Sequence, residues 1–516
     1  MLIAVICLAP LSGCGDGGEP ADATTLPVLP TAKPPEQNDD TLTLPFANRD
    51  VINPYLAASQ LNQELGTLLY EGLFTVDDRF APVPVLAEKM EQGESLTDWV
   101  VTLRQGRVFH SGAKVTPEDV AYSFLKAKGC ALYQARLAQA KSLRAREDGT
   151  LLLTLSQANA YIAANLDFPI VPAGSADEKK LAQAEHGYSF NRKTTPVGTG
   201  RYRLAQTDGS FHLSYDERHP GPKPLFTTIA LHGVNDTKSL LYGLEMGSYQ
   251  FAYDDLSEGR MVRVGASAAH VRLTNLIFLG VNQNRAPLND PALRQAIAAC
   301  INKSGVVGEA FHGYARAADT PFPPEWHGIE AKEFAQPFDR EGAKKRLEDL
   351  GYKQFDKSGT RTSKGRALKF SLIVNSGNDF KLAAANALRA QLAAFQISVE
   401  IRPLKLEDYQ AAVKKGQFDL YLGEVKLTPD CSLSPLLLQD GAATAGINVW
   451  GKASNAYGQM LQGLVTPAQF IGVFREETPF IPLGYRNGMA AVTRGMRMAL
   501  QCRQNDLFYD IANWKG

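Results

Sequence analysis

The stretch that decides the fold is LIFLGVNQNRAPLNDPALRQAIAACI, residues 276–301. Its first six residues, 276–281, are apolar and have the length of a buried strand. The chain then turns polar over residues 282–284, and Asp290 can cap a helix that begins at Pro291. The pattern predicts a strand, a polar loop and a helix within an α/β core. It leaves open a second interpretation, in which the strand crosses between two lobes and its polar end lines a cleft.

The chain that follows alternates between strand and helix patterns. Strands are predicted at residues 368–374, 397–401 and 418–422, with helices at 380–395 and 406–415 between them. A β-α-β-α-β alternation is typical of an α/β lobe.

Length and charge limit the class of protein. The chain has 516 residues, which is too long for one core, so two or three domains are expected. Lys and Arg total 54 and Asp and Glu total 54, so the formal net charge is zero. A balanced charge gives no electrostatic reason to expect a nucleic-acid partner.

The first residues have the pattern of an export signal. Residues 2–11 form an apolar run that is too short to span a membrane as a mature helix. The sequence LSGC at 11–14 has the pattern of a bacterial lipobox, which predicts a signal peptide at 1–14 and lipidation of Cys14. Residues 15–40 are rich in proline and glycine and predict a disordered tether that reaches roughly 30 Å. We therefore expect a protein anchored by lipid at the extracytoplasmic face of the cell membrane.

Catalytic and metal signatures are weak in this sequence. Residues 111–114 and 123–126 both fit S-x-x-K, but the partner motifs S-D-N and K-T-G are absent. G-x-S-x-G, H-E-x-x-H and Walker A motifs are also absent. His212 and His219 lie in a loop rich in proline and glycine, where we expect solvated side chains. The sequence therefore predicts no enzyme activity, no metal site and no cofactor.

The remaining cysteines, Cys130, Cys300, Cys431 and Cys502, match no zinc or redox spacing. They are expected to behave as small buried apolar side chains. The sequence leaves open whether two of them form a disulfide, because it does not show which cysteines lie close together.

Several segments resemble a known family in the order in which that family carries them. They are LYEGLF (69–74), WVVTLRQGRVFHSGAKVTPEDVAYSF (99–124), PVGTGRY (196–202), the helix-Gly-strand step at 240–254, and the helix segment 287–301 with Arg294 in place. Over about residues 42–500 the chain resembles the family 5 extracellular solute-binding proteins of ABC transporters. This family includes oligopeptide-, dipeptide- and nickel-binding lipoproteins.

The resemblance implies a fold and a division into domains. The fold is α/β and class II periplasmic-binding-protein-like, with two lobes around a ligand cleft and three domains, one of them discontinuous. Domain I is expected at 41–60, 193–275 and 480–516, domain II at 61–192 and domain III at 276–479. Residues 278–282 become a strand that crosses between the lobes, and residues 479–482 resemble the return crossing.

The resemblance also implies a function. It predicts a monomeric receptor that closes its cleft on a ligand, by default a peptide or peptide-like molecule, and delivers it to the permease and ATPase of an ABC importer. Two alternatives on the same fold stay open, a receptor for a non-peptide ligand and a ligand sensor or surface interaction protein. A secreted hydrolase would need a nucleophile and base, which the sequence does not supply.

One departure from the family pattern bears on the ligand. Peptide-binding members carry Gly-Trp-x-Ala-Asp-Tyr-x-Asp-Pro after the strand at 418–422, and the first Asp pairs with the amino group of the peptide. Here Gly423 and Asp430 match, Glu424 replaces the Trp, and Leu427 falls at the position of the first Asp. Either Glu424 or Lys426 is left as a charged contact for the ligand, with a solvated loop as the alternative for both.

The other predicted ligand contacts lie at the ends of strands or crossing segments. They are Asn48, Arg49, Asp50, Tyr253, Asp254, Asn282, Gln283, Asn284, Trp450, Tyr485 and Arg486. For residues 282–284 the sequence leaves open whether the amides touch ligand or only satisfy backbone groups at a bend.

Overall fold

A computed structural model describes residues 40–47, 50–175, 196–207, 210–234, 240–260, 267–493, 496 and 500–515. Cys14, Asn48 and Arg49, for which lipidation or ligand contact is predicted, lie outside these residues, as does all but the last residue of the predicted tether. Within the described ranges no helix has both the length and the apolar character needed to cross a membrane.

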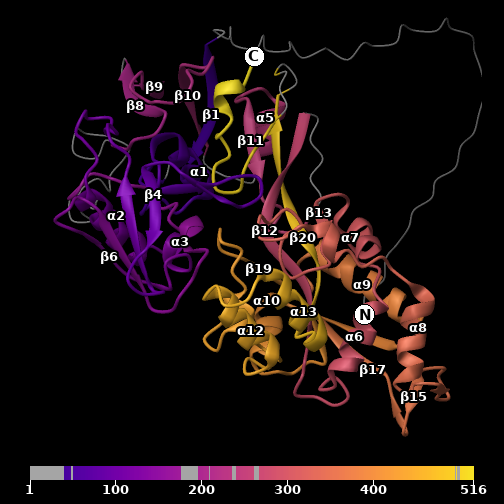
Figure 1. Cartoon of the computed structure of the whole chain (residues 1–516). Helices are drawn as coiled ribbons and strands as arrows, with labels where there is room; N and C mark the ends of the chain where they lie inside the picture. The colour runs from indigo at the N-terminus through magenta and orange to yellow at the C-terminus, as the bar shows by residue number, and fades with distance from the viewer. Residues whose placement is uncertain are drawn as a thin grey trace, which may run out of the picture. The chain divides into compact units, whose positions relative to one another are not determined.

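Two long strands, β12 (Ser267–Val281) and β20 (Phe480–Val492), run antiparallel beside each other (Figure 1). The start of β12 packs in one hydrophobic core through Val271, and its end packs in a second core through Val281. The strand that contains the apolar run 276–281 therefore crosses between cores, which confirms the crossing that the second interpretation predicted.

The pairing of these two strands is interrupted between the cores. Arg272 faces Asn487 and Leu276 faces Tyr485, so residues 273–275 of β12 stand opposite Arg486 alone. Such a bulge breaks the ladder locally and bends the strand.

The crossing strands belong to a seven-stranded sheet of order β11-β20-β12-β19-β17-β18, with β13 paired to β20. The other strands are β11 (Phe251–Asp254), β13 (Ala315–Ala317), β17 (Lys369–Asn375), β18 (Ser398–Leu404) and β19 (Leu420–Lys426). β17 pairs in parallel with β18 and β19. Helices α9 (Asp379–Ala393) and α10 (Leu406–Lys414) connect them, which confirms the predicted α/β alternation.

The first lobe contains two four-stranded sheets. One has the order β1-β10-β9-β8, with β1 (Thr41–Ala47), β8 (Tyr202–Thr207), β9 (Ser210–Tyr215) and β10 (Thr228–Val234). The other has the order β4-β5-β7-β6, with β4 (Ala87–Gln92), β5 (Asp98–Leu103), β6 (Ala140–Ala145) and β7 (Leu151–Leu155). β1 pairs in parallel with β10, so distant parts of the chain build one sheet.

Smaller elements complete the described fold. In the first lobe they are α1 (Gln60–Leu69), β2 (Phe74–Val76), β3 (Pro82–Pro84), α2 (Pro117–Gly129), α3 (Ala131–Gln134), η1 (Ile162–Asn165), α5 (Leu240–Glu245) and η5 (Ile511–Asn513). In the second lobe they are α6 (Pro291–Ala299), α7 (Lys303–Phe311), η4 (Ala331–Phe334), α8 (Arg340–Asp349), β14 (Gln354–Phe355), β15 (Arg361–Ser363), β16 (Arg366–Ala367), α11 (Ser434–Leu437), α12 (Lys452–Leu461) and α13 (Pro467–Glu477).

Capping side chains mark the starts of helices, among them Asp290, which the sequence predicted as a cap. Thr116 and Asp119 form a reciprocal capping box at the start of α2. Asp290 accepts a hydrogen bond from the backbone of Ala292 at the start of α6, and Asp339 caps α8.

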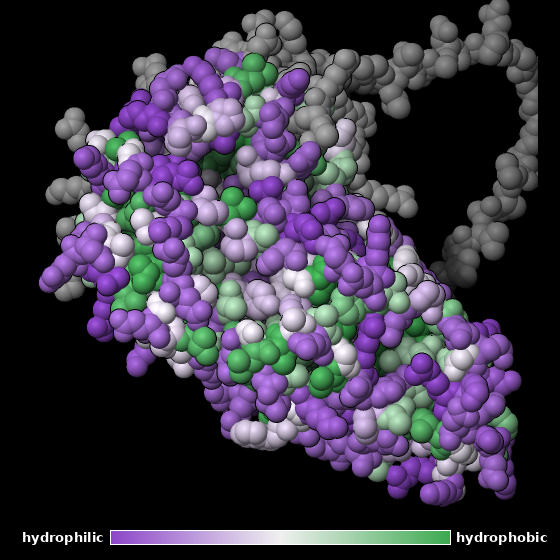
Figure 2. All heavy atoms as spheres, in the orientation of Figure 1, coloured by the Kyte–Doolittle hydropathy of each residue, from purple (hydrophilic) through white to green (hydrophobic). Residues whose placement is uncertain are grey.

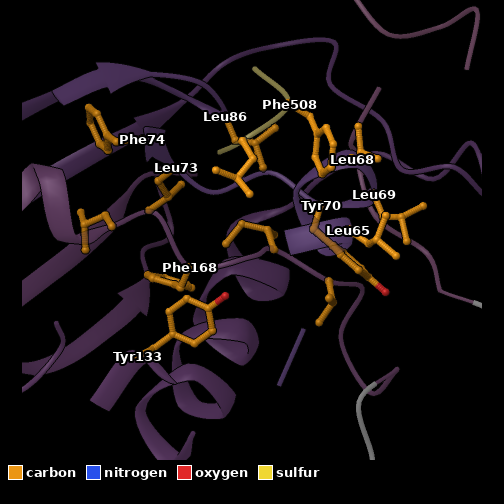
Figure 3. Packing of buried hydrophobic residues seen from close by; sticks show 14 of the residues in the cluster. Leu65, Leu68, Leu69, Tyr70, Leu73, Phe74, Leu86, Tyr133, Phe168 and Phe508 are labelled. Carbon is orange, nitrogen blue, oxygen red and sulfur yellow. The ribbon is translucent and has the colours of Figure 1, made fainter. Parts of the chain in front are cut away.

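The end of α1 explains two of the family motifs. Leu69, Tyr70 and Phe74 of LYEGLF are buried and gather in the first-lobe core with Tyr133 and Phe168 (Figure 3).

The face drawn in Figure 2 is mostly hydrophilic, with smaller hydrophobic areas between the polar side chains.

The Gly-Thr-Gly turn packs directly on this helix end. A Cβ atom at Gly198 would lie 2.0 Å from the carbonyl oxygen of Leu69, and one at Gly200 would lie 2.5 Å from that of Leu68. Only glycine permits this approach of two backbones.

The expectation for His219 was wrong. Its side chain is 9% exposed, and its Nε2 lies 3.2 Å from Glu71 Oε1, next to the ion pair between Glu71 and Arg107. The His219 ring is therefore buried in the first lobe, beside these charged partners.

The prediction that the cysteines are buried holds for Cys300 and Cys431. All four described cysteines are unpaired.

Candidate functional site

Two neighbouring cavities lie where first-lobe residues face second-lobe residues. The hinge cavity, about 380 Å³, is lined by α1, by Tyr253, and by Leu273 and Asn275 of the β12 bulge. The tryptophan cavity, about 900 Å³, is lined by residues that follow α3 and by the chain from β19 to α12, including Trp450. Among the described residues that line either cavity, Arg136 and Lys426 line both. The two cavities therefore form one cleft with this cationic pair at the junction.

Lys426 is the last residue of β19, and we predicted it as a ligand contact. It is an exposed residue, and none of the described residues forms an ion pair or hydrogen bond with its ammonium. Its pKa is nevertheless lowered, first by desolvation and then by the charge of Arg136. A position in a cleft explains both the exposure and the lowered pKa of Lys426. Water reaches the side chain, but the surrounding walls leave its ammonium less well solvated than at an open surface.

Arg136 follows α3 and was missed from the sequence. Its guanidinium pairs with Asp167, and the two side chains are 16% and 7% exposed. It also lies over the ring of Tyr133, 5.3 Å from the ring centre. Burial lowers the pKa of Arg136, but the charge of Asp167 outweighs it and raises the pKa overall. A lone arginine after a short helix carries no sequence signal, since its position at the cleft depends on the packing of the first lobe.

The hinge cavity also has an acidic wall on the first lobe, formed by Glu64, Asp255 and Asp506. Burial raises the pKa of Glu64 well above its usual value, and the nearby charge of Asp255 contributes to the shift. Burial likewise raises the pKa of Asp506 to about 6. The environment thus disfavours the charged form of these two carboxyl groups.

Glu424 contacts Asn275 of the hinge cavity wall, and its carboxylate has its partners within the protein. Its carboxylate accepts hydrogen bonds from Arg486 Nε at 2.8 Å and Asn275 Nδ2 at 2.8 Å, and Lys381 Nζ lies 3.0 Å away. Burial alone would raise the pKa of Glu424, but the charges of Lys381 and Arg486 hold it at about 2. The carboxylate therefore ties β12, β19, β20 and α9 together, and its contact with ligand stays a prediction.

Two other predicted contacts line the cleft. Tyr253 lines the hinge cavity, and burial raises the pKa of its hydroxyl. Trp450 lines the tryptophan cavity with its side chain 76% exposed. The Trp450 side chain therefore does not pack in a core.

The side-chain amides at the end of β12 form hydrogen bonds with backbone groups. Asn282 donates hydrogen bonds to the carbonyl oxygens of Gly416 and Phe418, and Gln283 donates to that of Pro479. The Asn284 amide donates to Asn282 Oδ1. None of the three lines either cavity, so their role at the ligand stays a prediction while their role at the bend is observed.

The remaining predicted contacts also lie outside the lining of the two cavities. Asp50 accepts from backbone amides of the loop before α1, Asp254 accepts from the Leu256 amide, Gly423 packs on Phe278, and Tyr485 donates to the Pro321 carbonyl. Tyr485 and Arg486 are 0% and 2% exposed. Contact between these residues and a ligand stays a prediction.

Asp430 connects the lobes beside the cleft. It accepts a hydrogen bond from Asn159 Nδ2 at 3.1 Å, and its own amide donates to Asn165 Oδ1 at 3.3 Å. Asp430 lines the tryptophan cavity, and burial raises its pKa. Its match to the family pattern was visible in the sequence, but its partners on the first lobe were not.

The chain resembles known proteins in sequence and in fold. The profile described as bacterial extracellular solute-binding proteins, family 5 Middle, matches residues 81–437. The chain belongs to this family. Its members are solute-binding proteins of ABC importers that act outside the cytoplasm with a permease, and they bind peptides or small molecules. The confirmed family also confirms the periplasmic-binding-protein fold with a cleft between two lobes.

Relatives of this family 5 protein differ in their ligands. The glutathione-binding protein GsiB of Pectobacterium atrosepticum is 26% identical over 310 residues, which cover 58% of this chain and 59% of the relative. The oligopeptide-binding protein AppA of Bacillus subtilis is 21% identical over 406 residues, covering 75% of this chain and 72% of AppA. The crystal structure of NikA from Brucella suis with Fe(III)-EDTA aligns with a TM-score of 0.66 at 19% identity, covering 92% and 100% of the two chains. The alignment with GsiB therefore spans about three-fifths of the length of that relative.

Proposed function

We propose that this chain is a lipid-anchored extracytoplasmic receptor that binds a peptide or peptide-like solute in the cleft and delivers it to an ABC importer permease. The observation that carries the proposal is the pair of adjoining cavities between residues of two lobes that β12 and β20 connect. A ligand in such a cleft contacts both lobes only when they approach, so it shifts the equilibrium towards the closed form.

Peptide-like ligands are the default because GsiB and AppA are named for glutathione and oligopeptides. The chain departs from amine capture by an aspartate, because Leu427 occupies that position and is 2% exposed. A ligand amino group has an acidic group available in the hinge cavity, at Asp255.

Native mass spectrometry of the protein as purified tests the proposal, because a retained solute adds a discrete mass. Protein stripped by unfolding and refolding is then titrated with a tripeptide library while tryptophan emission is followed. Trp450 is 76% exposed and lines the cleft, whereas Trp326 and Trp514 are at most 1% exposed. We expect a change in emission that Trp450→Phe removes. Absence of both a retained mass and any library binding would contradict the proposal.

A further inference from the structure

We propose that Arg136 and Lys426 form a clamp for a ligand carboxylate, with one cation on each side of the cleft. The inference rests on the proposed function and names the chemical class of its ligand: a peptide-like solute with a free carboxylate held between a guanidinium and an ammonium group.

The geometry places the two cations at a junction. Arg136 follows α3 in the first lobe, where its neighbours Tyr133 and Leu137 belong to the first-lobe core. Lys426 ends β19, and its neighbour Leu427 belongs to a core of the second lobe. Because both side chains line both cavities, a group bound between them contacts both lobes at once.

Among the described charges around this junction, one cation has no direct partner. Arg136 is paired with Asp167, and Arg486 is paired with Glu424. Asp255 and Glu64 act on Lys426 from beyond ion-pair distance, and burial disfavours the charged form of Glu64. Among the described residues, no carboxylate is bound to Lys426, and Arg136 faces it across the cleft as a second cation.

An anion at the junction removes this repulsion. A carboxylate placed between the two groups accepts charge-assisted hydrogen bonds from both, which are stronger and more directional than neutral ones. Two like charges that oppose closure in the empty cleft then stabilise the closed form when the anion is bound. Leu427 occupies the position of the amine-binding aspartate. This wall of the cleft therefore presents the cation Lys426 to a ligand instead of an acid, which suits a ligand carboxylate.

The test uses two tripeptide libraries that lack Asp and Glu residues, one with free C-terminal carboxylates and one with C-terminal amides. Binding to stripped full-length protein is measured by native mass spectrometry and by competition. We expect the free acids to bind at least tenfold more tightly than the amides. We expect Lys426→Gln to reduce this preference to less than threefold.

Controls separate the clamp from folding and from general charge. Lys414→Gln removes an exposed lysine of α10 that lines neither cavity, and it should keep the full preference. Since Arg136→Gln leaves Asp167 buried and unpaired, the double variant Arg136→Gln with Asp167→Asn is used to remove both charges together, and it too should lose the preference.

The outcomes are distinct. Equal binding of acids and amides overturns the clamp and leaves the peptide receptor standing. An acid preference that survives both the Lys426 variant and the Arg136 double variant overturns the assignment to these residues. Binding of neither library, with no retained mass, overturns the peptide receptor and the clamp with it.

Discussion

Arg486 Nε donates a 2.8 Å hydrogen bond to Glu424 Oε1 and so joins the crossing strand β20 to β19. Arg486 is the residue that stands alone opposite the bulge of β12, and Asn275 of that bulge donates to the same carboxylate oxygen. The point at which the two lobes are connected is therefore held by one buried carboxylate.

Replacing Glu424 with Gln should destabilise the protein strongly. The side chains of Glu424 and Arg486 are 11% and 3% exposed, so the substitution leaves a buried guanidinium without its counter-charge. Removing one partner of a buried pair typically costs about 3–5 kcal/mol. Urea unfolding should show this loss, while Glu407→Gln on the exposed face of α10 should change stability by less than about 0.5 kcal/mol. A similar stability for the two variants would contradict the assigned role.

The same carboxylate should make stability depend on acid pH. The pKa of Glu424 is about 2 in the folded protein, below the ordinary value of 4.5. A depressed pKa contributes stability that is fully present above the ordinary value and is lost as pH falls from there towards 2. Unfolding free energies measured between pH 5 and pH 2 should fall less steeply in Glu424→Gln than in the unsubstituted protein. Parallel curves would show that the group titrates normally.

Gly198→Ala should disrupt the contact between the Gly-Thr-Gly turn and the end of α1. Its Cβ would lie 2.0 Å from the Leu69 carbonyl oxygen, which is backbone and cannot move aside without shifting the helix end. Overpacking of this kind costs about 1–3 kcal/mol or more. The matched control is Gly308→Ala within α7, where a Cβ meets nothing within 4 Å. This control should be neutral or stabilise by about 0.5–1 kcal/mol. Thermal unfolding of both variants measures the contrast.

Cys14→Ser should release the protein from the membrane, because the proposed lipid anchor is attached at that residue. Cells that express each form are fractionated, and the receptor is quantified in membrane and soluble fractions. Cys130→Ser is the control and should remain in the membrane fraction. Equal membrane retention of the Cys14 and Cys130 variants would contradict lipidation at Cys14.

Local patterns in the sequence determined much of the fold. Apolar runs and capping residues predicted the strand at 276–281, the helix that begins at Pro291 and the parallel α/β segment of the second lobe, since these depend on side-chain periodicity and on hydrogen bonds between near neighbours. The order of the family motifs predicted the crossing strand. Each of these motifs also consists of a few adjacent residues, so it is visible in the sequence alone.

Only the tertiary structure decided which charged groups remain available to a ligand. Glu424 and Lys426 were equal candidates in the sequence, two residues apart. The structure surrounds Glu424 with Asn275, Lys381 and Arg486, and it brings Lys426 to the same cavities as Arg136. The protonation and hydrogen bonding of a side chain depend on partners that are distant in the chain, and their approach is set by the packing of whole lobes and not by local sequence.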